Sequence, residues 1–445
     1  MAEHPSLDEL QDFVQGVLPA ERAHRVVAHL LRGCMICGAV LIPEVEAVFL
    51  EIPDPLEDPG YDDAIDRAYA FQRWHGPAAM KQRAKARKAL ALLEAGGIER
   101  LSEAPTNLKG IAACEALLER SWALRREDPH QMVELASHAT LVADHLSPKL
   151  YEPRQLADLR CRAWSALGNA YRVTDNLRLA EWALDRAAEI SLQGTGDETL
   201  SVRLLDLQAS LYGAQRRFSL AFELLDAIYV VHRRRGDDQT AGRILIKKGL
   251  YTGYSNDPSG AVRLLTEGLA MIDSKRDPQL TLSAIHNIIW FLMEGENFRK
   301  ARNVLWENRW RYTRHGGKID LVKLRWLQGR IEAGLGNVAA AEEALREARE
   351  GLEKEDLAYH AALSSLDLGG ILLRQGRAEE ARTVVLEGTE VFLALDIQIE
   401  AIKAVLVLQK VFTTGVEARI ILDETTRFLR RIEYDPALTF SAWFL

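Results

Sequence analysis

Small and aliphatic residues recur along this chain with a period of 40 or 41 residues. Six alanines mark the period, and an aliphatic residue follows each of them four positions later: Ala180 and Leu184, Ala221 and Leu225, Ala261 and Leu265, Ala301 and Leu305, Ala341 and Leu345, Ala381 and Val385. Twelve positions before these alanines stand, in order, Gly168, Ala209, Gly249, Ile289, Gly329 and Gly369. Spacings of this kind place residues on one side of a helix, so the pattern predicts a repeated hairpin of two helices whose small residues face each other. Stacked hairpins form a solenoid, and solenoids usually bind other molecules rather than catalyse reactions.

Turn-forming residues fall at matching places between the paired helices. Glycine, asparagine and aspartate tolerate the left-handed or capping conformations that such turns need. The predicted turns are Asp175-Asn176, Gln215 to Arg217, Asn256 to Pro258, Gly295 to Asn297, Gly336-Asn337 and Gln375-Gly376. After Ala381 the period weakens, and we expect residues 417–431 to form a last hairpin arm or a cap. The C-terminal aromatic residues that follow are expected to cover the end of the solenoid: Phe440, Trp443 and Phe444.

The first clear repeat carries a recognisable signature. It reads W-x2-L-G-x2-Y and is followed by two alanines: Trp164, Leu167, Gly168, Tyr171, Ala180 and Ala187. This order and spacing resemble the tetratricopeptide (TPR) repeat, although Leu184 stands where Phe is usual and the closing proline is missing. The resemblance covers residues 107–420 and implies an all-α fold, a right-handed solenoid of TPR-like hairpins. Because the period exceeds the usual one, we expect helices about one turn longer in places.

A separate small module is predicted at the N-terminus. Leu7, Leu10 and Phe13 have helical spacing, and a second helix is expected to start near Pro19. The pattern His29-x4-Cys34-x2-Cys37 follows, with His4 upstream, and thiolate and imidazole groups are the ligands that zinc prefers. A module of this size needs a cross-link to be stable alone, and a bound zinc ion would provide it.

The same residues carry a second resemblance. His4, the helix of Leu7, Leu10 and Phe13, and His29 to Cys37 are similar to the zinc-binding anti-sigma-factor domain. The resemblance implies that His4, His29, Cys34 and Cys37 bind zinc, which in that family is mainly structural and in some members a thiol redox switch. The gap between His29 and Cys34 is one residue longer than the family pattern. Two alternatives remain open, namely a pair of buried thiols or a redox pair at Cys34 and Cys37.

Proline-rich sequence separates this module from the rest. Pro53, Pro55 and Pro59 cannot continue a helix, so this stretch is predicted to be a linker. The helical pattern returns at residues 61–74 and 78–95, and Gly96-Gly97 is expected to stop the second of these helices. Residues 108–127 and 129–147 are expected to form an opening hairpin. The predicted domains are a zinc module at 1–52, a linker and helical hairpin at 53–106, and a solenoid at 107–445.

Composition and charge limit the classes of function and the cellular compartment that we expect. The formal net charge of −8 argues against a general nucleic-acid binder. No secretory signal or membrane-spanning stretch is expected, and four cysteines point to a reducing compartment, so we expect a cytoplasmic protein. Cys114 and Cys161 lie within helical patterns and are interpreted as buried thiols.

No catalytic motif is found, and the chain is not expected to be an enzyme. The fourth and fifth repeats are rich in aromatic residues, which are expected mostly to pack but are the first place to look for a ligand groove: Trp290, Phe291, Phe298, Trp306, Trp310, Tyr312 and Trp326. Asn287, Arg325 and Arg330 could supply polar contacts there.

The sequence therefore predicts a regulatory protein that binds a protein or peptide partner. In one version the N-terminal module binds a sigma factor and the solenoid receives a signal. In the other the zinc module is only a structural cap and the solenoid is a scaffold or a peptide sensor. A zinc or thiol redox switch is the alternative from a different class. Fold does not fix function, so all three remain open at this point.

Overall fold

The helices occupy most of the chain. The computed structural model describes Ser6, Glu9, Arg22 and residues 77–432, apart from residues 104, 106, 107, 109, 126, 150, 396–398 and 415–418. Within this part every regular element is an α-helix, which confirms the all-α prediction. The chain divides into two compact units, one of Glu57–Tyr251 and Leu264–Leu280, the other of Met1–Leu56, Thr252–Arg263 and Thr281–Leu445. No helix in the described part is long and apolar enough to cross a membrane.

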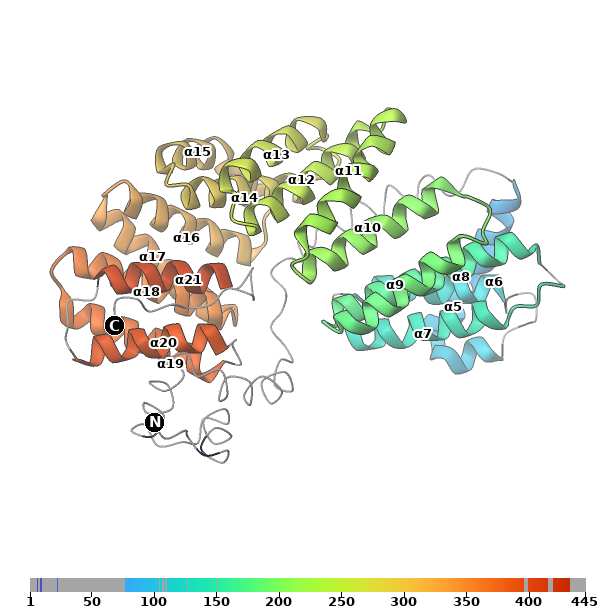
Figure 1. Ribbon diagram of the computed structural model, residues 1–445, viewed down its shortest axis with the longest axis horizontal. Coiled ribbons are helices and arrows are strands. Elements are labelled where there is room, and N and C mark those ends of the chain that lie inside the picture. The colour runs from blue at the N-terminus through green and yellow to red at the C-terminus, as the bar shows by residue number, and fades with distance from the viewer. Residues whose placement is uncertain are drawn as a thin grey trace. The chain divides into compact units, whose positions relative to one another are not determined.

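Figure 1 shows the helices in chain order. The first half of the described chain contains α5 (Pro77–Ser102), α6 (Ile111–Ala123), α7 (Pro129–His145), α8 (Pro153–Val173), α9 (Leu177–Ser191), α10 (Glu198–Ala214), α11 (Phe218–Arg234), α12 (Asp238–Tyr254) and α13 (Pro258–Met271). The second half contains α14 (Pro278–Glu294), α15 (Phe298–His315), α16 (Lys318–Gly334), α17 (Val338–Lys354), α18 (Ala358–Arg374), α19 (Ala378–Ala394), α20 (Ile399–Thr414) and α21 (Arg419–Ile432). In each repeat the even-numbered helix comes first, and we call α8, α10, α12, α14, α16 and α18 the first helices.

The repeat register predicted from the sequence is confirmed. All six marker alanines are fully buried, as are Leu225, Leu265, Leu345 and Val385. A Cβ atom added to Gly168 would stand 2.7 Å from Cγ of Leu184 and 3.2 Å from the carbonyl oxygen of Ala180. A Cβ atom at Gly329 would likewise meet Cγ of Leu345 at 2.7 Å. The aliphatic residue therefore packs directly on the glycine of its own hairpin, which explains why the two positions recur together.

The predicted turns are also confirmed, and they share one geometry. Each contains a residue with positive φ, namely Asp175, Arg216, Asn256, Glu296, Gly336 or Gly376. In the first turn, Asn176 N–H donates to the Tyr171 carbonyl at 2.8 Å and Asp175 N–H donates to the Arg172 carbonyl at 3.0 Å. This pair of bonds is the Schellman motif, which satisfies carbonyls at the end of a helix. Asp257 caps α13 as expected, because its carboxylate accepts from the Gly260 N–H at 2.8 Å.

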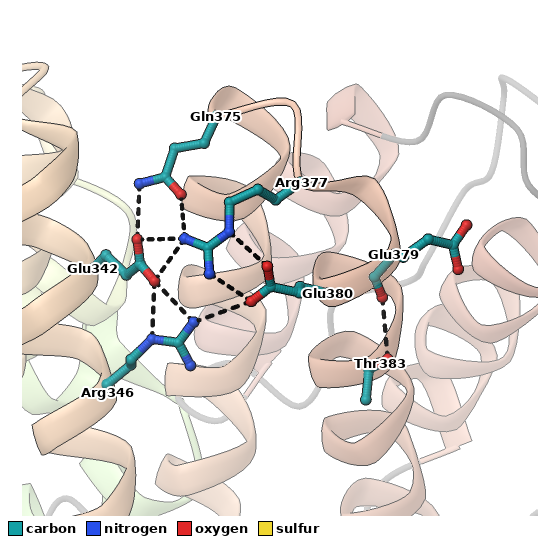
Figure 2. A network of polar contacts seen from close by, with 7 residues as sticks. All are labelled: Glu342, Arg346, Gln375, Arg377, Glu379, Glu380 and Thr383. Atoms are coloured by element: carbon teal, nitrogen blue, oxygen red, sulfur yellow. Dashed lines mark hydrogen bonds and ion pairs between the residues drawn. The ribbon is translucent and has the colours of Figure 1, made fainter.

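A glutamate ties neighbouring hairpins together in two of the repeats. Glu342, one residue after its marker alanine, accepts from Gln375 and Arg377 of the next turn at 2.8 Å each. Figure 2 shows that Arg346 and Glu380 extend this network. Glu181 makes the equivalent bonds with Gln215 at 2.9 Å and Arg217 at 2.6 Å. These carboxylates therefore hold the stack of hairpins together, and arginines neutralise them.

Helices precede and follow the regular repeats. Residues Gly96 and Gly97 break α5, as predicted, but the helix resumes and ends at Ser102. Leu93 and Leu101 of α5 share a core with Leu117 of α6 and Met132 of α7, the expected opening hairpin. At the other end α21 packs on α18 and α20, and the hydroxyl of Tyr359 donates to the Leu429 carbonyl at 2.8 Å. This confirms a final arm that caps the solenoid.

Several predictions concern residues outside the described part of the chain. These are the zinc ligands, the proline-rich linker, the helix at 61–74 and the C-terminal aromatic residues, and they stay predictions. One detail of the N-terminal region is described. The N–H of Ser6 donates to the Glu9 carboxylate at 3.2 Å, and the N–H of Glu9 donates to the Ser6 hydroxyl at 3.1 Å. This reciprocal pair is a capping box, which marks the start of a helix.

Candidate functional site

A cluster of aromatic and charged side chains joins the first helices α14, α16 and α18 in one unit. The indole of Trp326 meets Trp290 at a centroid distance of 5.6 Å and His360 at 5.7 Å, both edge to face. The guanidinium of Arg330 stacks over Trp290, with 4.4 Å between Cζ and the ring centroid. We call this set the Trp–Arg cluster: His286, Asn287, Trp290 and Glu294 of α14, Lys323, Trp326 and Arg330 of α16, His360 and Asp367 of α18, and Arg430 of α21.

Helical spacing brings these side chains to one face. His286, Trp290 and Glu294 are four residues apart on α14, so they form one stripe along that helix. The stripe on α16 has spacings of three and four, through Lys323, Trp326 and Arg330. Successive first helices then place these stripes next to one another. Leu327 and Ile331, two aliphatic residues in the second half of α16, are buried.

Two carboxylates hold the cluster together. Glu294 accepts from Arg330 at 2.8 Å. Asp367 accepts from the indole nitrogen of Trp326 at 3.0 Å, pairs with Arg430, and lies 4.0 Å from Arg330. Burial alone would raise the pKa of Glu294, but the positive charges of Arg330, Arg430 and Arg427 and the hydrogen bond from Arg330 lower it. Both acids are therefore matched to arginines.

The remaining polar groups of the cluster have spare binding capacity. Neither Lys323 nor Asn287 forms a hydrogen bond or ion pair with a described residue, and both are only partly buried. Arg330 is 8% exposed, and its Nη1 atom is buried without a hydrogen-bond partner. Three cations thus face two carboxylates in the cluster, so it retains an excess of positive charge.

Two histidines border this positive charge and are neutral at physiological pH. Burial lowers the pKa of His286 to about 3, and the nearby charges of Lys323 and Arg330 act in the same direction. Burial and Lys323 lower the pKa of His360 to about 4. Nδ1 of His286 lies 3.3 Å from the hydroxyl oxygen of Tyr312, whose pKa is raised by burial. The histidines therefore offer neutral hydrogen-bonding groups beside the cations.

First helices of the other unit also carry buried charges, but these are paired. Lys247 lies 3.1 Å from Asp206, and Arg243 pairs with Asp277. Asp206 also forms an ion pair with Arg203 at 3.5 Å. These groups are at most 14% exposed and each is ion-paired, although Nε of Arg243 is buried without a hydrogen-bond partner among the described residues, and we interpret their role as structural.

The aromatic and polar residues singled out in the sequence differ in burial and in whether they belong to the cluster. Phe291, Tyr312 and Trp326 are buried, as expected for packing, whereas Trp306 and Trp310 are exposed. Arg330 and Asn287 belong to the Trp–Arg cluster. Arg325 does not, because it bonds to Glu347 of α17 at 2.5 Å.

The structure also describes two of the four cysteines. Cys114 and Cys161 are fully buried, and burial raises the pKa of Cys114 to about 12 and of Cys161 to about 11, so both thiols stay protonated. Among the described residues, no group of three or more His, Cys, Asp or Glu side chains could hold a metal ion. His4, His29, Cys34 and Cys37 lie outside the described residues, so the zinc site stays a prediction.

Sequence reasoning missed six members of the cluster: His286, Glu294, Lys323, His360, Asp367 and Arg430. A signal for those on α14 was present, since His286 and Glu294 flank Trp290 at four-residue spacing. Arg430 had none, because it meets Asp367 across 63 residues of sequence. Such a pairing depends on how the capping helix folds back on the solenoid.

Comparisons with known proteins bear on the fold. A scan of protein-family profiles finds no match, and a search of curated proteins finds none either. Solved structures do match. The apo form of the quorum sensor NprR from B. thuringiensis has a TM-score of 0.52 and 14% identity, over 69% of this chain and 83% of that chain.

Two further structures have the same architecture. Aspartyl phosphate phosphatase F from Bacillus subtilis has a TM-score of 0.50 and 13% identity, over 89% of this chain and 97% of that chain. A signal transduction ATPase with a tetratricopeptide repeat sensor, from Pyrococcus horikoshii, has a TM-score of 0.52 and 14% identity, over 79% of this chain and 55% of that chain. At this identity the similarity is one of fold. The chain therefore folds as a solenoid of TPR-like helical hairpins.

Proposed function

We propose that this chain is a regulatory binding protein rather than an enzyme, and that the Trp–Arg cluster binds a peptide or protein segment bearing a carboxylate. The observation that carries the proposal is the excess positive charge of the cluster, where Glu294 and Asp367 pair with arginines and Lys323 pairs with no described carboxylate. The ammonium of Lys323 and the amide of Asn287, both partly exposed, would donate hydrogen bonds to that carboxylate. Trp290 would contact an apolar side chain of the same segment, since aromatic residues are favoured anchors.

The fold supports this kind of ligand. Solenoids present extended surfaces built from successive repeats, and such surfaces suit a linear segment of another chain. NprR is described as a quorum sensor, and the Pyrococcus horikoshii protein carries a repeat sensor. A sensor function for this chain would need a ligand, and the Trp–Arg cluster provides the groups to bind one. The TPR scaffold without a dedicated ligand is the alternative.

The test uses the full-length protein and a library of short synthetic peptides with free C-terminal carboxylates. We expect captured peptides, identified by mass spectrometry, to lose about tenfold in affinity when Lys323→Met and Asn287→Ala are combined, because hydrogen bonds to charged groups are removed. Neither residue forms a hydrogen bond or ion pair with a described residue, so we expect the fold to be unaffected. Lys318→Met is the matched control, since Lys318 is exposed at the start of α16. Unchanged binding by the double variant, or no captured peptide, would assign the cluster a structural role.

We also propose a zinc site in the N-terminal module, as the anti-sigma resemblance implies. His4, His29, Cys34 and Cys37 would hold the ion, and four protein ligands would make the site structural. With a short proline-rich linker to the solenoid, a weak contact could control access to the module, because tethering keeps the local concentration high. The partner we propose for this module is a sigma factor.

Metal content tests this second proposal. Full-length protein purified from its host after zinc-replete growth should contain about one zinc ion per molecule and co-purify with a sigma factor. Cys34→Ser should abolish both zinc binding and co-purification of the sigma factor, because the module folds around the metal. The helical circular dichroism signal of the solenoid should remain. Cys114→Ser, at a buried thiol, is the control. Zinc retained without the sigma factor would favour the purely structural module, and release of zinc on oxidation would favour the redox switch.

A further inference from the structure

The outer face of α15 differs from the other faces of the solenoid. This helix contains six lysine and arginine residues and one glutamate. Ala301, Leu305 and Tyr312 are its buried residues, and they define its inner side. On the opposite side Trp306 is 64% exposed and Trp310 is 47% exposed. We call the exposed set the α15 face: Arg299, Arg302, Trp306, Arg309, Trp310 and Arg314.

The cations of this face have no carboxylate partner among the described residues. Arg299, Arg302, Arg309 and Arg314 are exposed, and none forms an ion pair or hydrogen bond with a described residue. The arginines of α17 behave differently, since Arg346 pairs with Glu342 and Glu380. Arg299 and Arg302 stand three residues apart, a spacing at which like charges destabilise a helix, and neither pairs with a described carboxylate.

Guanidinium groups and indole rings are interleaved on the α15 face. Cζ of Arg309 lies 3.7 Å from the ring centroid of Trp306. Cζ of Arg311 lies 4.5 Å from the ring centroid of Trp310. The two tryptophans are four residues apart, so they stand one helical turn from each other on the same side. Exposed Trp and Arg in contact are the residues that dominate binding energy at protein interfaces.

We propose that the α15 face is a docking surface for an acidic segment of a partner protein, separate from the Trp–Arg cluster. Charge complementarity selects this occupant, because the face is strongly basic on a chain whose net charge is −8. The carboxylates of the segment pair with Arg299, Arg302 and Arg309. An apolar side chain of the segment packs between Trp306 and Trp310, which removes both indoles from water.

Two observations favour a protein over a nucleic acid. Single-stranded nucleic acids bind by stacking bases on open aromatic rings along a basic groove. Here a guanidinium already covers one face of each ring. The overall negative charge would also repel a long polyanion that extends beyond this helix.

The experiment measures fluorescence anisotropy of a labelled helical peptide in which glutamate and leucine alternate with helical spacing, titrated with full-length protein. We expect saturable binding that weakens as salt rises. Trp306→Ser with Trp310→Ser should weaken it about tenfold or more, and Arg302→Ala with Arg309→Ala should do the same. These side chains are exposed, so circular dichroism should show an unchanged helical content.

Matched controls lie on α9. Trp182 is 54% exposed and Arg186 is paired with Glu189, so Trp182→Ser and Arg186→Ala should leave peptide binding unchanged. Lys318→Met, at an exposed lysine of α16 that belongs to neither proposed site, should also leave it unchanged. The proposal is overturned if the wild-type protein does not bind the acidic peptide, or if the α15 variants bind it as well as wild type. Tighter binding of oligo(dT) than of the peptide, lost in the same variants, would assign the face to nucleic acid instead.

Discussion

Replacing Asp367 with alanine is expected to lower the free energy of unfolding by about 3 kcal/mol, because it removes the carboxylate that pairs with Arg430 and lies 4.0 Å from the buried Arg330. Asp367 is 13% exposed and accepts from Trp326 and Arg430, which is itself 12% exposed. Its loss also removes a tie between α18 and the capping helix α21. We therefore expect amide hydrogens of α21 to lose protection before those of α16 and α17. Urea unfolding measures the change in the free energy of unfolding. Hydrogen exchange shows which helix loses protection first.

The control for this variant is an exposed ion pair in the same unit. Glu387 is 50% exposed and pairs with Arg349 at 2.9 Å. Glu387→Ala should cost at most about 1 kcal/mol, since exposed pairs contribute little in water. Equal costs for the two variants would show that Asp367 does not bridge buried charges.

The repeat register was predictable because close packing limits what each position can hold. Gly329 must lack a side chain, since Leu345 occupies that space, and the two residues recur at fixed spacing for this reason. The turns were predictable on equally local grounds. A helix that ends in a Schellman motif needs one left-handed residue, and Asn256 or Gly376 adopts that conformation at low cost.

The surfaces were harder to predict because they depend on contacts between distant residues. Trp306 and Trp310 were grouped with the packing aromatics of the fourth repeat, although the register itself separates them. Leu305 and Tyr312 follow Ala301 by four and eleven residues and lie inside, whereas Trp306 and Trp310 fall on the other side of the helix. The pairing of Asp367 with Arg430 had no local signal, because it requires the stacked geometry of α18 and α21.

Acidification below neutrality is expected to destabilise the unit that contains the Trp–Arg cluster. The pKa of His286 is lowered to about 3 and that of His360 to about 4 in the folded chain, from 6.5. The unfolded chain therefore binds protons at these residues more readily than the folded chain. Their contribution to stability is fully present above pH 6.5 and is lost as the pH falls toward the folded values. At about pH 5 each histidine should lower the free energy of unfolding by about 2 kcal/mol.

Urea unfolding between pH 7.5 and pH 5 measures this loss in the range where the histidines titrate and most carboxylates do not. The stabilising carboxylates act at lower pH. Hydrogen bonds from Gln375, Arg346 and Arg377 outweigh burial and lower the pKa of Glu342 to about 2, so its contribution is lost only below about pH 4.5. His286→Gln and His360→Gln should each flatten the pH dependence, whereas His130→Gln, at an exposed histidine of α7, should not. A slope that is the same in all three variants would mean that His286 and His360 accept protons in the folded chain as readily as in the unfolded one. The cationic surroundings of Lys323 and Arg330 argue against that outcome, because a fourth and fifth positive charge in the cluster would have no carboxylate to balance them.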